Sequence, residues 1–234
     1  MFIPILSVVT AIFATLTILL RRKGKSFEGM LCKFISSFGF MSMAFIGFCY
    51  RIEEADKLVH PFYFCLVAFG LLFGLGGDVL LGIKEIAPKY KNKLIALGTL
   101  AFLIGHFFYL ASFYKAEPTF SIIPYIAAFV ITAIIAIIIK AIKMKLDSKM
   151  YILCVFYFFV IALCACVSGY MLYLTRSLTF IITTIASVVF VISDSVLAFV
   201  YFTPVKRKNP LVTTELATYY TGQILMAATV YLIK

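Results

Sequence analysis

Long apolar runs alternate with short polar connections along the whole chain. About twenty predominantly apolar residues are enough for a helix to cross the hydrocarbon core of a bilayer. Backbone groups in hydrocarbon must be hydrogen-bonded within their own segment, and the runs lack the ten-residue alternation of barrel strands, so helices are the predicted element. The pattern predicts spans at residues 2–20, 31–50, 61–83, 94–114, 121–139, 150–174, 178–202 and 212–232.

This pattern predicts an all-α, polytopic transmembrane helical bundle in a single domain over residues 1–234. The composition agrees, because 13% of the residues are charged and the mean hydropathy is +1.09, whereas soluble domains carry about 25% charged residues. Residues 2–20 follow no basic segment and exceed a typical signal-peptide core, so they are expected to remain as the first span. The expected location is a bacterial inner membrane or a eukaryotic endomembrane.

The net charge of +11 comes from basic residues that lie between apolar runs. It therefore indicates membrane orientation rather than a nucleic-acid partner. With Lys33 included, the odd-numbered connections hold sixteen lysines and arginines, against five for the even-numbered connections and the C-terminus together. Because basic residues concentrate on the cytoplasmic side, both termini are predicted to be non-cytoplasmic.

The carboxylates Asp78 and Asp194 lie deep inside predicted spans. A carboxylate at such a depth costs about 2.5–3.5 kcal/mol on insertion scales, so it indicates a functional site by default. The alternative is that each acid pairs with Lys33, with His106 or with a tyrosine only to hold the helices together. With the predicted orientation, most of these polar residues fall in the cytoplasmic half of the membrane.

The helix before the first acid presents small residues on one face, in the pattern Gly70-x-x-x-Gly74-x-Gly76-Gly77-Asp78. Such a face permits close approach by another helix or by a lipid chain. A substrate cleft and simple helix packing therefore both remain open for this face.

The surroundings of the two acids also share a pattern. Gly77-Asp78-x-x-Leu81 and Ser193-Asp194-x-x-Leu197 are separated by 194 − 78 = 116 residues, which is close to half the chain. A parallel repeat of four plus four spans would produce this offset, and a chance match in apolar sequence would produce it as well.

Other polar residues in the spans are candidates for binding or proton transfer. His106 and Tyr109 lie three residues apart and so share a helical face, although a lone histidine in an apolar helix is often a hydrogen-bonded core residue. Lys33 can hold a phosphate, neutralise an acid or extend to the headgroup level, and the last span supplies Tyr220 and Gln223 as donors. With only two histidines and no CxxC pair, neither a metal nor a cofactor is predicted.

Four ordered motifs resemble one known family. They are Phe73-Gly74-Leu75-Gly76-Gly77-Asp78-Val79-Leu80-Leu81, Gly105-His106-Phe107-Phe108-Tyr109, Phe190-Val191-Ile192-Ser193-Asp194-Ser195 and Tyr219-Tyr220-Thr221-Gly222-Gln223. In this order and spacing they resemble the YhhN-like lysoplasmalogenase family of eight-span membrane proteins. The resemblance extends from about Lys33 to the C-terminus.

The resemblance implies hydrolysis of the vinyl ether bond of lysoplasmalogens, with a lysophospholipid in the bilayer as the binding partner. Such hydrolysis needs a proton donor and a nearby negative charge, as in glycosidases. The implied catalytic residues are Asp194 as the acid, Asp78 as the charge that stabilises the cation, and His106 as a relay, with the two acids exchangeable. The implied substrate-binding residues are Lys33, Tyr109, Ser193, Tyr220 and Gln223.

Two other functions fit the same pattern of residues. A proton-coupled transporter of small molecules or lipids would also bury acids and a histidine among many spans, although no span shows the proline-interrupted pattern expected at a carrier site. The second alternative is a non-catalytic membrane protein whose acids serve helix assembly alone.

Overall fold

The computed structural model describes residues 2–55, 60–204 and 208–233, which form a bundle of long helices without strands. A single 3-10 turn, η1 (Pro88–Tyr90), precedes the fourth long helix. The long helices are α1 (Phe2–Arg22), α2 (Ser26–Ala55), α3 (Pro61–Ile86), α4 (Lys91–Ala116), α5 (Ile123–Ala141), α6 (Ser148–Thr175), α7 (Leu178–Phe202) and α8 (Lys208–Leu232).

Each predicted span forms one of these helices, which confirms the helical bundle. Several helices extend beyond the apolar run that predicted them, because helical structure continues past the hydrocarbon boundary into polar sequence. Among the described residues, α1 to α7 are long and apolar enough to cross a membrane. Helix α8 is more polar, and several of its polar side chains are buried in the bundle, namely Glu215, Tyr219, Tyr220 and Gln223.

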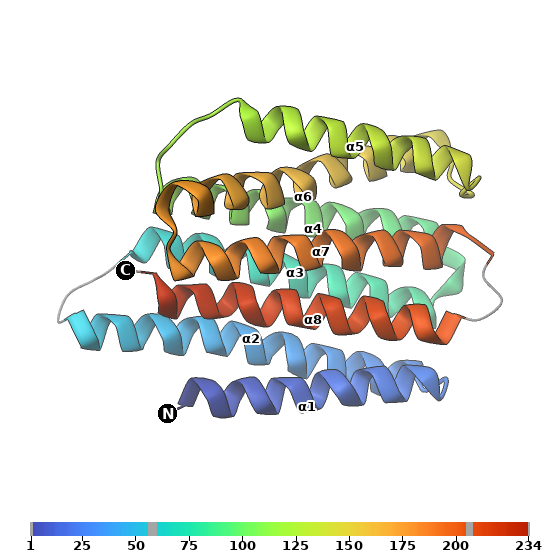
Figure 1. The fold of residues 1–234 in the computed structure, drawn as a ribbon. Coiled ribbons are helices and arrows are strands. Elements are labelled where there is room, and N and C mark those ends of the chain that lie inside the picture. The colour runs from blue at the N-terminus through green and yellow to red at the C-terminus, as the bar shows by residue number, and fades with distance from the viewer. Residues whose placement is uncertain (1, 56–59, 205–207, 234) are drawn as a thin grey trace.

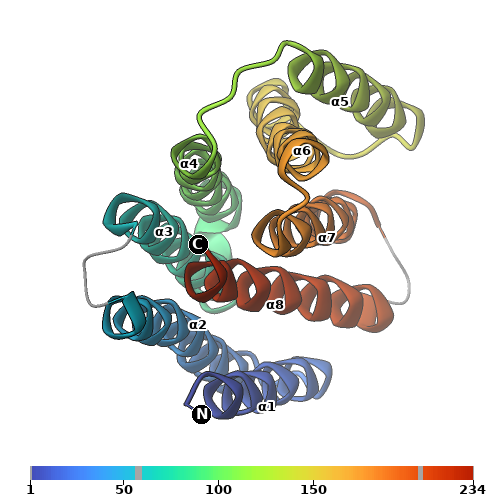
Figure 2. The ribbon, with the colours of Figure 1, turned by 60° about the vertical axis from the view of Figure 1, so that its left-hand side comes forward.

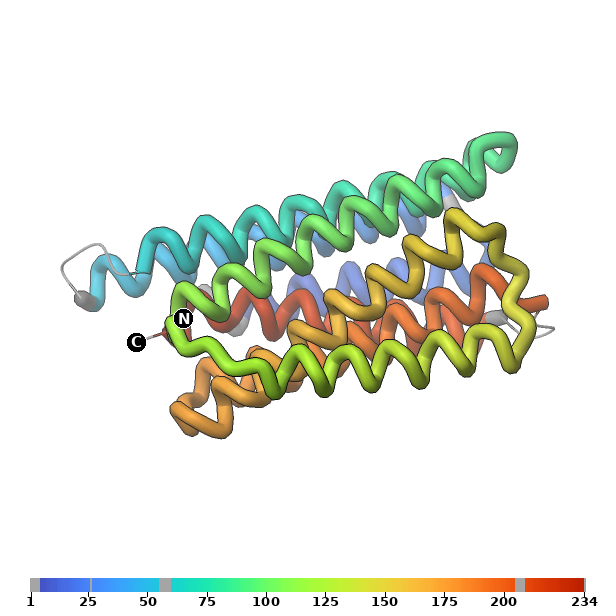
Figure 3. The backbone as a smooth tube through the Cα atoms, turned by 90° about the horizontal axis from the view of Figure 1, so that it is seen from above, coloured from blue at the N-terminus to red at the C-terminus, as the bar shows by residue number. Residues whose placement is uncertain are grey.

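Successive helices run in opposite directions, as the ribbon in Figure 1 and the backbone tube in Figure 3 show. Both termini lie at one end of the bundle. The α1–α2, α3–α4 and α5–α6 connections lie at the other end, which we call the basic end because it holds most of the lysine-rich connections. The structure thus places these connections on one side, while the assignment of that side to the cytoplasm stays a prediction.

Helix packing is compatible with a parallel repeat of four plus four helices, one of the two explanations left open for the 116-residue offset. The contacts of α1 with α2, α2 with α3 and α3 with α4 correspond to those of α5 with α6, α6 with α7 and α7 with α8. The contact of α4 with α6 likewise corresponds to that of α8 with α2. Helix α8 breaks the symmetry, because it also contacts α1 and α3 and so lies nearer the centre than α4 does (Figure 2).

Helix α5 lies at the outside of the bundle, where it packs on α6 (Figure 2), and its Tyr125 hydroxyl is 2.9 Å from the Tyr114 hydroxyl of α4. Its outer face is apolar, with Phe129 and Ile137 exposed by 68% and 66%. An apolar surface of this size matches hydrocarbon better than water. The α5 face therefore supports a position in contact with lipid.

The glycine face of α3 packs against α4. A Cβ atom added at Gly70 would lie 2.2 Å from the Tyr109 ring, and one at Gly77 would lie 2.7 Å from the Phe102 ring. At Gly76, by contrast, an added Cβ atom would meet nothing within 4 Å. The structure therefore supports helix packing rather than a cleft as the role of this face, and the packing positions the rings of α4 beside the first acid.

Candidate active site

Asp78 lies in a charged, hydrogen-bonded cluster between α2, α3 and α8. Its Oδ1 atom is 2.8 Å from Lys33 Nζ, and both side chains are at least 95% buried. Its Oδ2 atom accepts hydrogen bonds from the hydroxyls of Ser37 at 2.9 Å and Tyr219 at 2.7 Å. Lys33 and Ser37 are one helical turn apart on α2, so they reach the acid from the same face. Oδ1 thus has an ion-pair partner and Oδ2 has two hydrogen-bond donors.

A chain of hydrogen bonds continues from this cluster to α4. Gln223 Nε2 donates to the Tyr219 hydroxyl at 3.0 Å, and the Tyr109 hydroxyl donates to Gln223 Oε1 at 2.8 Å. Gln223 lies one turn after Tyr219 on α8, so that both face the bundle interior. Three helices are thereby connected through side chains that are almost fully buried.

Asp194 on α7 has a much simpler environment. Its Oδ2 atom accepts a short hydrogen bond from the Tyr157 hydroxyl of α6. Among the described residues no lysine or arginine forms an ion pair with it. It lines a cavity of about 30 Å³ together with mainly apolar side chains and Thr99. A volume of this size holds a water molecule, for which Asp194, Tyr157 and Thr99 supply polar partners.

His106 lies between the two acids. Its Nδ1 atom is 2.9 Å from the Phe102 carbonyl oxygen, which can only accept a hydrogen bond. The proton is therefore on Nδ1, and Nε2 is the bare nitrogen; it is buried and has no hydrogen-bond partner in the described part of the chain. The ring meets Tyr109 and Tyr157 edge-on, with centroid distances of 5.7 Å each. His106 thus joins the tyrosine of the Asp78 chain to the tyrosine of Asp194.

Some residues expected at the site lie elsewhere. The Ser193 hydroxyl donates to the Glu215 carbonyl oxygen at 3.1 Å and so connects α7 to α8 rather than facing a cavity. Tyr220 is buried with its ring against Tyr219, and it is Tyr219 that bonds Asp78. Of the three roles expected for Lys33, the structure shows the neutralisation of an acid, because Lys33 forms an ion pair with Asp78.

Sequence reasoning missed two partners of the acids, Ser37 and Tyr157. Ser37 follows Lys33 by four residues, so helical spacing was an available signal. Tyr157 lies in a span with several aromatic residues, and nothing in the sequence distinguishes it from its neighbours. Only the packing of α6 on α7 selects this side chain.

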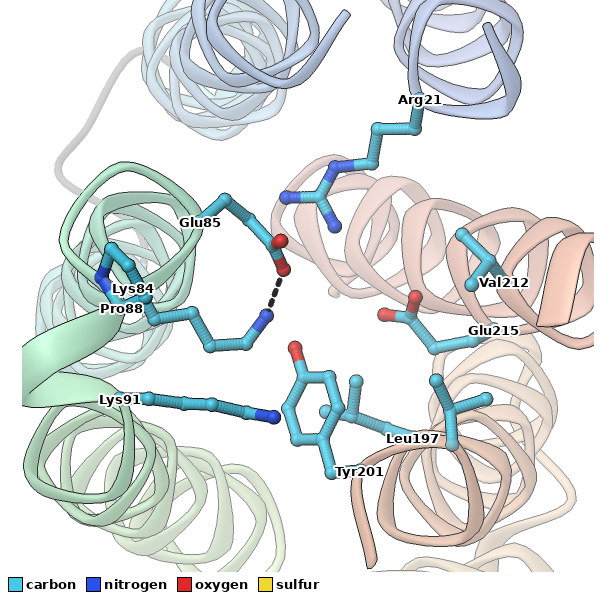
Figure 4. Close-up of a pocket in the computed structure, with 10 residues that line it drawn as sticks. Arg21, Lys84, Glu85, Pro88, Lys91, Leu197, Tyr201, Val212 and Glu215 are labelled. Carbon is cyan, nitrogen blue, oxygen red and sulfur yellow. Dashed lines mark hydrogen bonds and ion pairs between the residues drawn. The ribbon is translucent and has the colours of Figure 1, made fainter. Parts of the chain in front are cut away.

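A second, polar cavity opens at the basic end and was also missed. Its volume is about 390 Å³, and charged side chains from four helices point into it (Figure 4). Lys84 and Glu215 are each 5% exposed, although both are charged residues. Glu215 falls within the predicted span 212–232, so the rule that selected Asp78 and Asp194 also applied to it. The residues that line this cavity are Arg21, Lys84, Glu85, Pro88, Lys91, Leu197, Val200, Tyr201, Val212 and Glu215.

Thiols and metal ligands show no comparable cluster. All six cysteines are free; Cys154 and Cys164 are buried, whereas Cys49 and Cys65 are exposed on the outside of the bundle. Among the described residues, no group of three or more His, Cys, Asp or Glu side chains is placed to hold a metal ion. His60 lies at the N-terminus of α3, at the opposite end of that helix from Asp78.

Comparison with known proteins agrees with the motifs. The model of a family described as the YhhN family matches residues 30–230. The matched region covers all the helices that contribute to the two acid sites. Among curated proteins and solved structures, none matches the chain.

Proposed function

The chain belongs to the YhhN family, and we propose that it is a membrane-embedded hydrolase that cleaves the vinyl ether bond of lysoplasmalogens. The products are a fatty aldehyde and a glycerophospho-headgroup compound. The observation that supports this proposal best is the presence of two buried carboxylates in unlike environments, one ion-paired and one beside a water-sized cavity. An acid-catalysed reaction through a cation needs a donor and a separate negative charge.

Asp194 acts as the general acid. Its proton passes to the vinyl carbon that does not bear oxygen, and the electron pair of the double bond forms the new C–H bond. The adjacent carbon and the ether oxygen then share the positive charge of an oxocarbenium ion. Asp194 suits this step because its only hydrogen-bond partner in the described structure is a hydroxyl, without a cation to hold it as a carboxylate.

Water completes the reaction. A molecule in the cavity beside Asp194 attacks the oxocarbenium carbon, and the Asp194 carboxylate takes up the proton that this water loses. The resulting hemiacetal releases the glycerol oxygen as an alcohol and leaves the aldehyde. One water is consumed, and the acid returns to its protonated form.

Asp78 supplies the second charge. It orients the chain of Tyr219, Gln223 and Tyr109 toward His106 and stabilises the cation electrostatically, while Lys33 limits the cost of burying the carboxylate. The bare Nε2 atom of His106 polarises the attacking water or relays its proton.

The carrier remains the alternative function, because the four-plus-four packing is also found in transporters. Carrier sites commonly form where transmembrane helices are interrupted. In the described structure α3 and α7 run as continuous α-helices through both acids. The hydrolase needs no gradient, so activity in detergent separates the two functions.

The test is aldehyde release from a lysoplasmalogen by purified protein in detergent, with Asp78→Asn, Asp194→Asn and the control Tyr63→Phe. Tyr63 is a buried tyrosine that bonds Thr229 away from both acids, so its variant reports on a lost buried hydroxyl alone. We expect the native protein and the control to release aldehyde and both asparagine variants to lose activity while folded. A folded native protein without aldehyde release would contradict the hydrolase and favour the carrier.

A further inference from the structure

The polar cavity at the basic end has an unusual distribution of charge. Lys84 pairs with Glu85 and also lies over the Tyr201 ring, with Nζ 4.3 Å from its centroid. Arg21 extends into the cavity from α1, and Glu215 faces it from α8 (Figure 4). A cation and an anion thus face each other across about 390 Å³ of open space.

Lys91 adds a further cation at the rim, with its ammonium directed toward Tyr201 (Figure 4). The lining side chains therefore carry three positive charges and two negative charges. The Arg21 guanidinium suits a phosphodiester, because it can donate two parallel hydrogen bonds to the phosphate oxygens. The buried Glu215 carboxylate beside it suits an ammonium group.

The polar cavity is a neighbour of the cavity beside Asp194. Leu197 and Tyr201 line both the polar cavity and the 30 Å³ cavity beside the acid. Tyr201 follows Asp194 by seven residues on α7, a rise of about 10 Å along the helix axis. In a lysoplasmalogen the phosphorus and the vinyl carbon that is protonated are about seven bonds apart, or roughly 8 Å at the rise per bond of an extended chain. A headgroup in the polar cavity therefore places the vinyl ether at the depth of Asp194.

We propose that this cavity is the headgroup site and that it binds a zwitterionic phosphodiester. The phosphate lies against Arg21, the ammonium group lies against Glu215, and Lys91 adds positive charge at the rim. Binding exchanges the attraction between Arg21 and Glu215 for two ion pairs with the ligand. This inference rests on the proposed function for the identity of the lipid, and it moves phosphate binding from Lys33, which is occupied by Asp78, to the basic end.

Binding of lipids that cannot be cleaved tests the site without any need for catalysis. The probes are a 1-O-alkyl lysophosphoethanolamine, the matching 1-O-alkylglycerol without a headgroup, and the matching alkylglycerol phosphate without the amine, each titrated calorimetrically into purified protein in a neutral detergent. We expect the native protein to bind the zwitterionic lipid at least about tenfold more tightly than the headgroup-free lipid.

Variants paired with exposed controls test which residue binds the phosphate and which binds the ammonium group. Arg21→Gln should remove most of the preference for the phosphate-bearing lipids, whereas Arg22→Gln, on the exposed neighbour in the sequence, should leave it unchanged. Glu215→Gln should abolish the preference for the amine-bearing lipid over the amine-free phosphate, whereas Glu28→Gln, exposed on α2, should not.

Lys91→Gln provides a test that does not disturb the interior, because Lys91 is exposed at the first residue of α4. We expect it to weaken binding of the phosphate-bearing lipids severalfold relative to Lys93→Gln, an exposed lysine outside the cavity lining. Equal affinity of the native protein for all three lipids, or equal losses in each variant and its control, would overturn the proposal.

The headgroup site and the hydrolase activity can be rejected independently of each other. Headgroup-dependent binding without aldehyde release would keep the headgroup site and reject the hydrolase. Aldehyde release without headgroup-dependent binding would keep the hydrolase and reject the site.

Discussion

The two acids occupy corresponding helices of the repeat but have different surroundings. Asp78 on α3 has three partners, from α2 and α8, and one of them is a cation. Asp194 on α7 has one hydroxyl partner from α6 and an adjacent cavity. In each half of the bundle the acid is thus held from the helix that precedes it, which is α2 for α3 and α6 for α7.

This difference shows how a repeated scaffold can give two chemical roles to one residue type. The repeat fixes the depth and direction of both carboxylates. The position of α8, whose backbone lies close to α3, gives Asp78 the additional partner Tyr219. The corresponding helix α4 meets α7 through side chains instead, with the His106 ring centroid 5.2 Å from that of Phe190. We therefore expect substitutions at Asp78 to affect stability first and substitutions at Asp194 to affect chemistry first.

The largest expected effect is a loss of activity at Asp194 that leaves the stability of the protein nearly unchanged. Asp194→Asn keeps an oxygen that can accept the Tyr157 hydrogen bond but removes the transferable proton. Aldehyde release should fall by about 10²–10⁴-fold, the usual contribution of a general acid, while resistance to unfolding in an SDS titration should change little. Activity within tenfold of the native protein would show that another group donates the proton.

The next effect concerns the ion pair. Lys33→Met leaves the Asp78 carboxylate buried without its cation, which typically costs about 3–5 kcal/mol. The double variant Lys33→Met/Asp78→Asn should recover a large part of that loss, because it removes both charges. Unfolding in SDS measures both, with Lys25→Met on an exposed lysine as the control. A double variant as unstable as the single one would show that the ion pair contributes little.

Removal of single hydroxyls should distinguish the two acids at a smaller scale. Tyr219→Phe takes one donor from a carboxylate that retains two other partners, whereas Tyr157→Phe takes the only described donor from Asp194. A lost buried hydrogen bond costs about 1–3 kcal/mol. We expect Tyr157→Phe to lower kcat for aldehyde release about tenfold and Tyr219→Phe to lower mainly stability. Equal kinetic effects would remove the distinction between the two sites.

The smallest effect tests how α3 and α4 position the rings between the acids. Gly70→Ala places a methyl group against the Tyr109 ring and should destabilise the protein by about 1–3 kcal/mol through overpacking. Gly76→Ala on the same helix meets open space, so it should be neutral or stabilise by up to about 1 kcal/mol through helix propensity. The two midpoints in SDS are the measurement, and equal midpoints would contradict the packing described for this face.

Much of the architecture could be predicted because hydrophobicity acts locally. Each of the eight spans forms one helix, and residues 178–202 form a helix with the predicted bounds. The ends of the helices were predicted less accurately. Helix α3 continues past the predicted residue 83 to Ile86 and thereby places Lys84 and Glu85 in the wall of the polar cavity. A helix end depends on the partners that its last polar residues find, and these partners come from other helices.

By itself, the sequence determined the all-helical fold, the alternation of helix directions and the two intramembrane acids, because burial in lipid imposes its cost on each segment separately. The tertiary structure decided which neighbours each acid has. Tyr157 rather than another tyrosine meets Asp194, and Tyr219 rather than Tyr220 meets Asp78, because the rotation and contacts of α6 and α8 select one face of each helix. Such choices depend on the packing of helices distant in sequence, for which no local pattern of residues is sufficient.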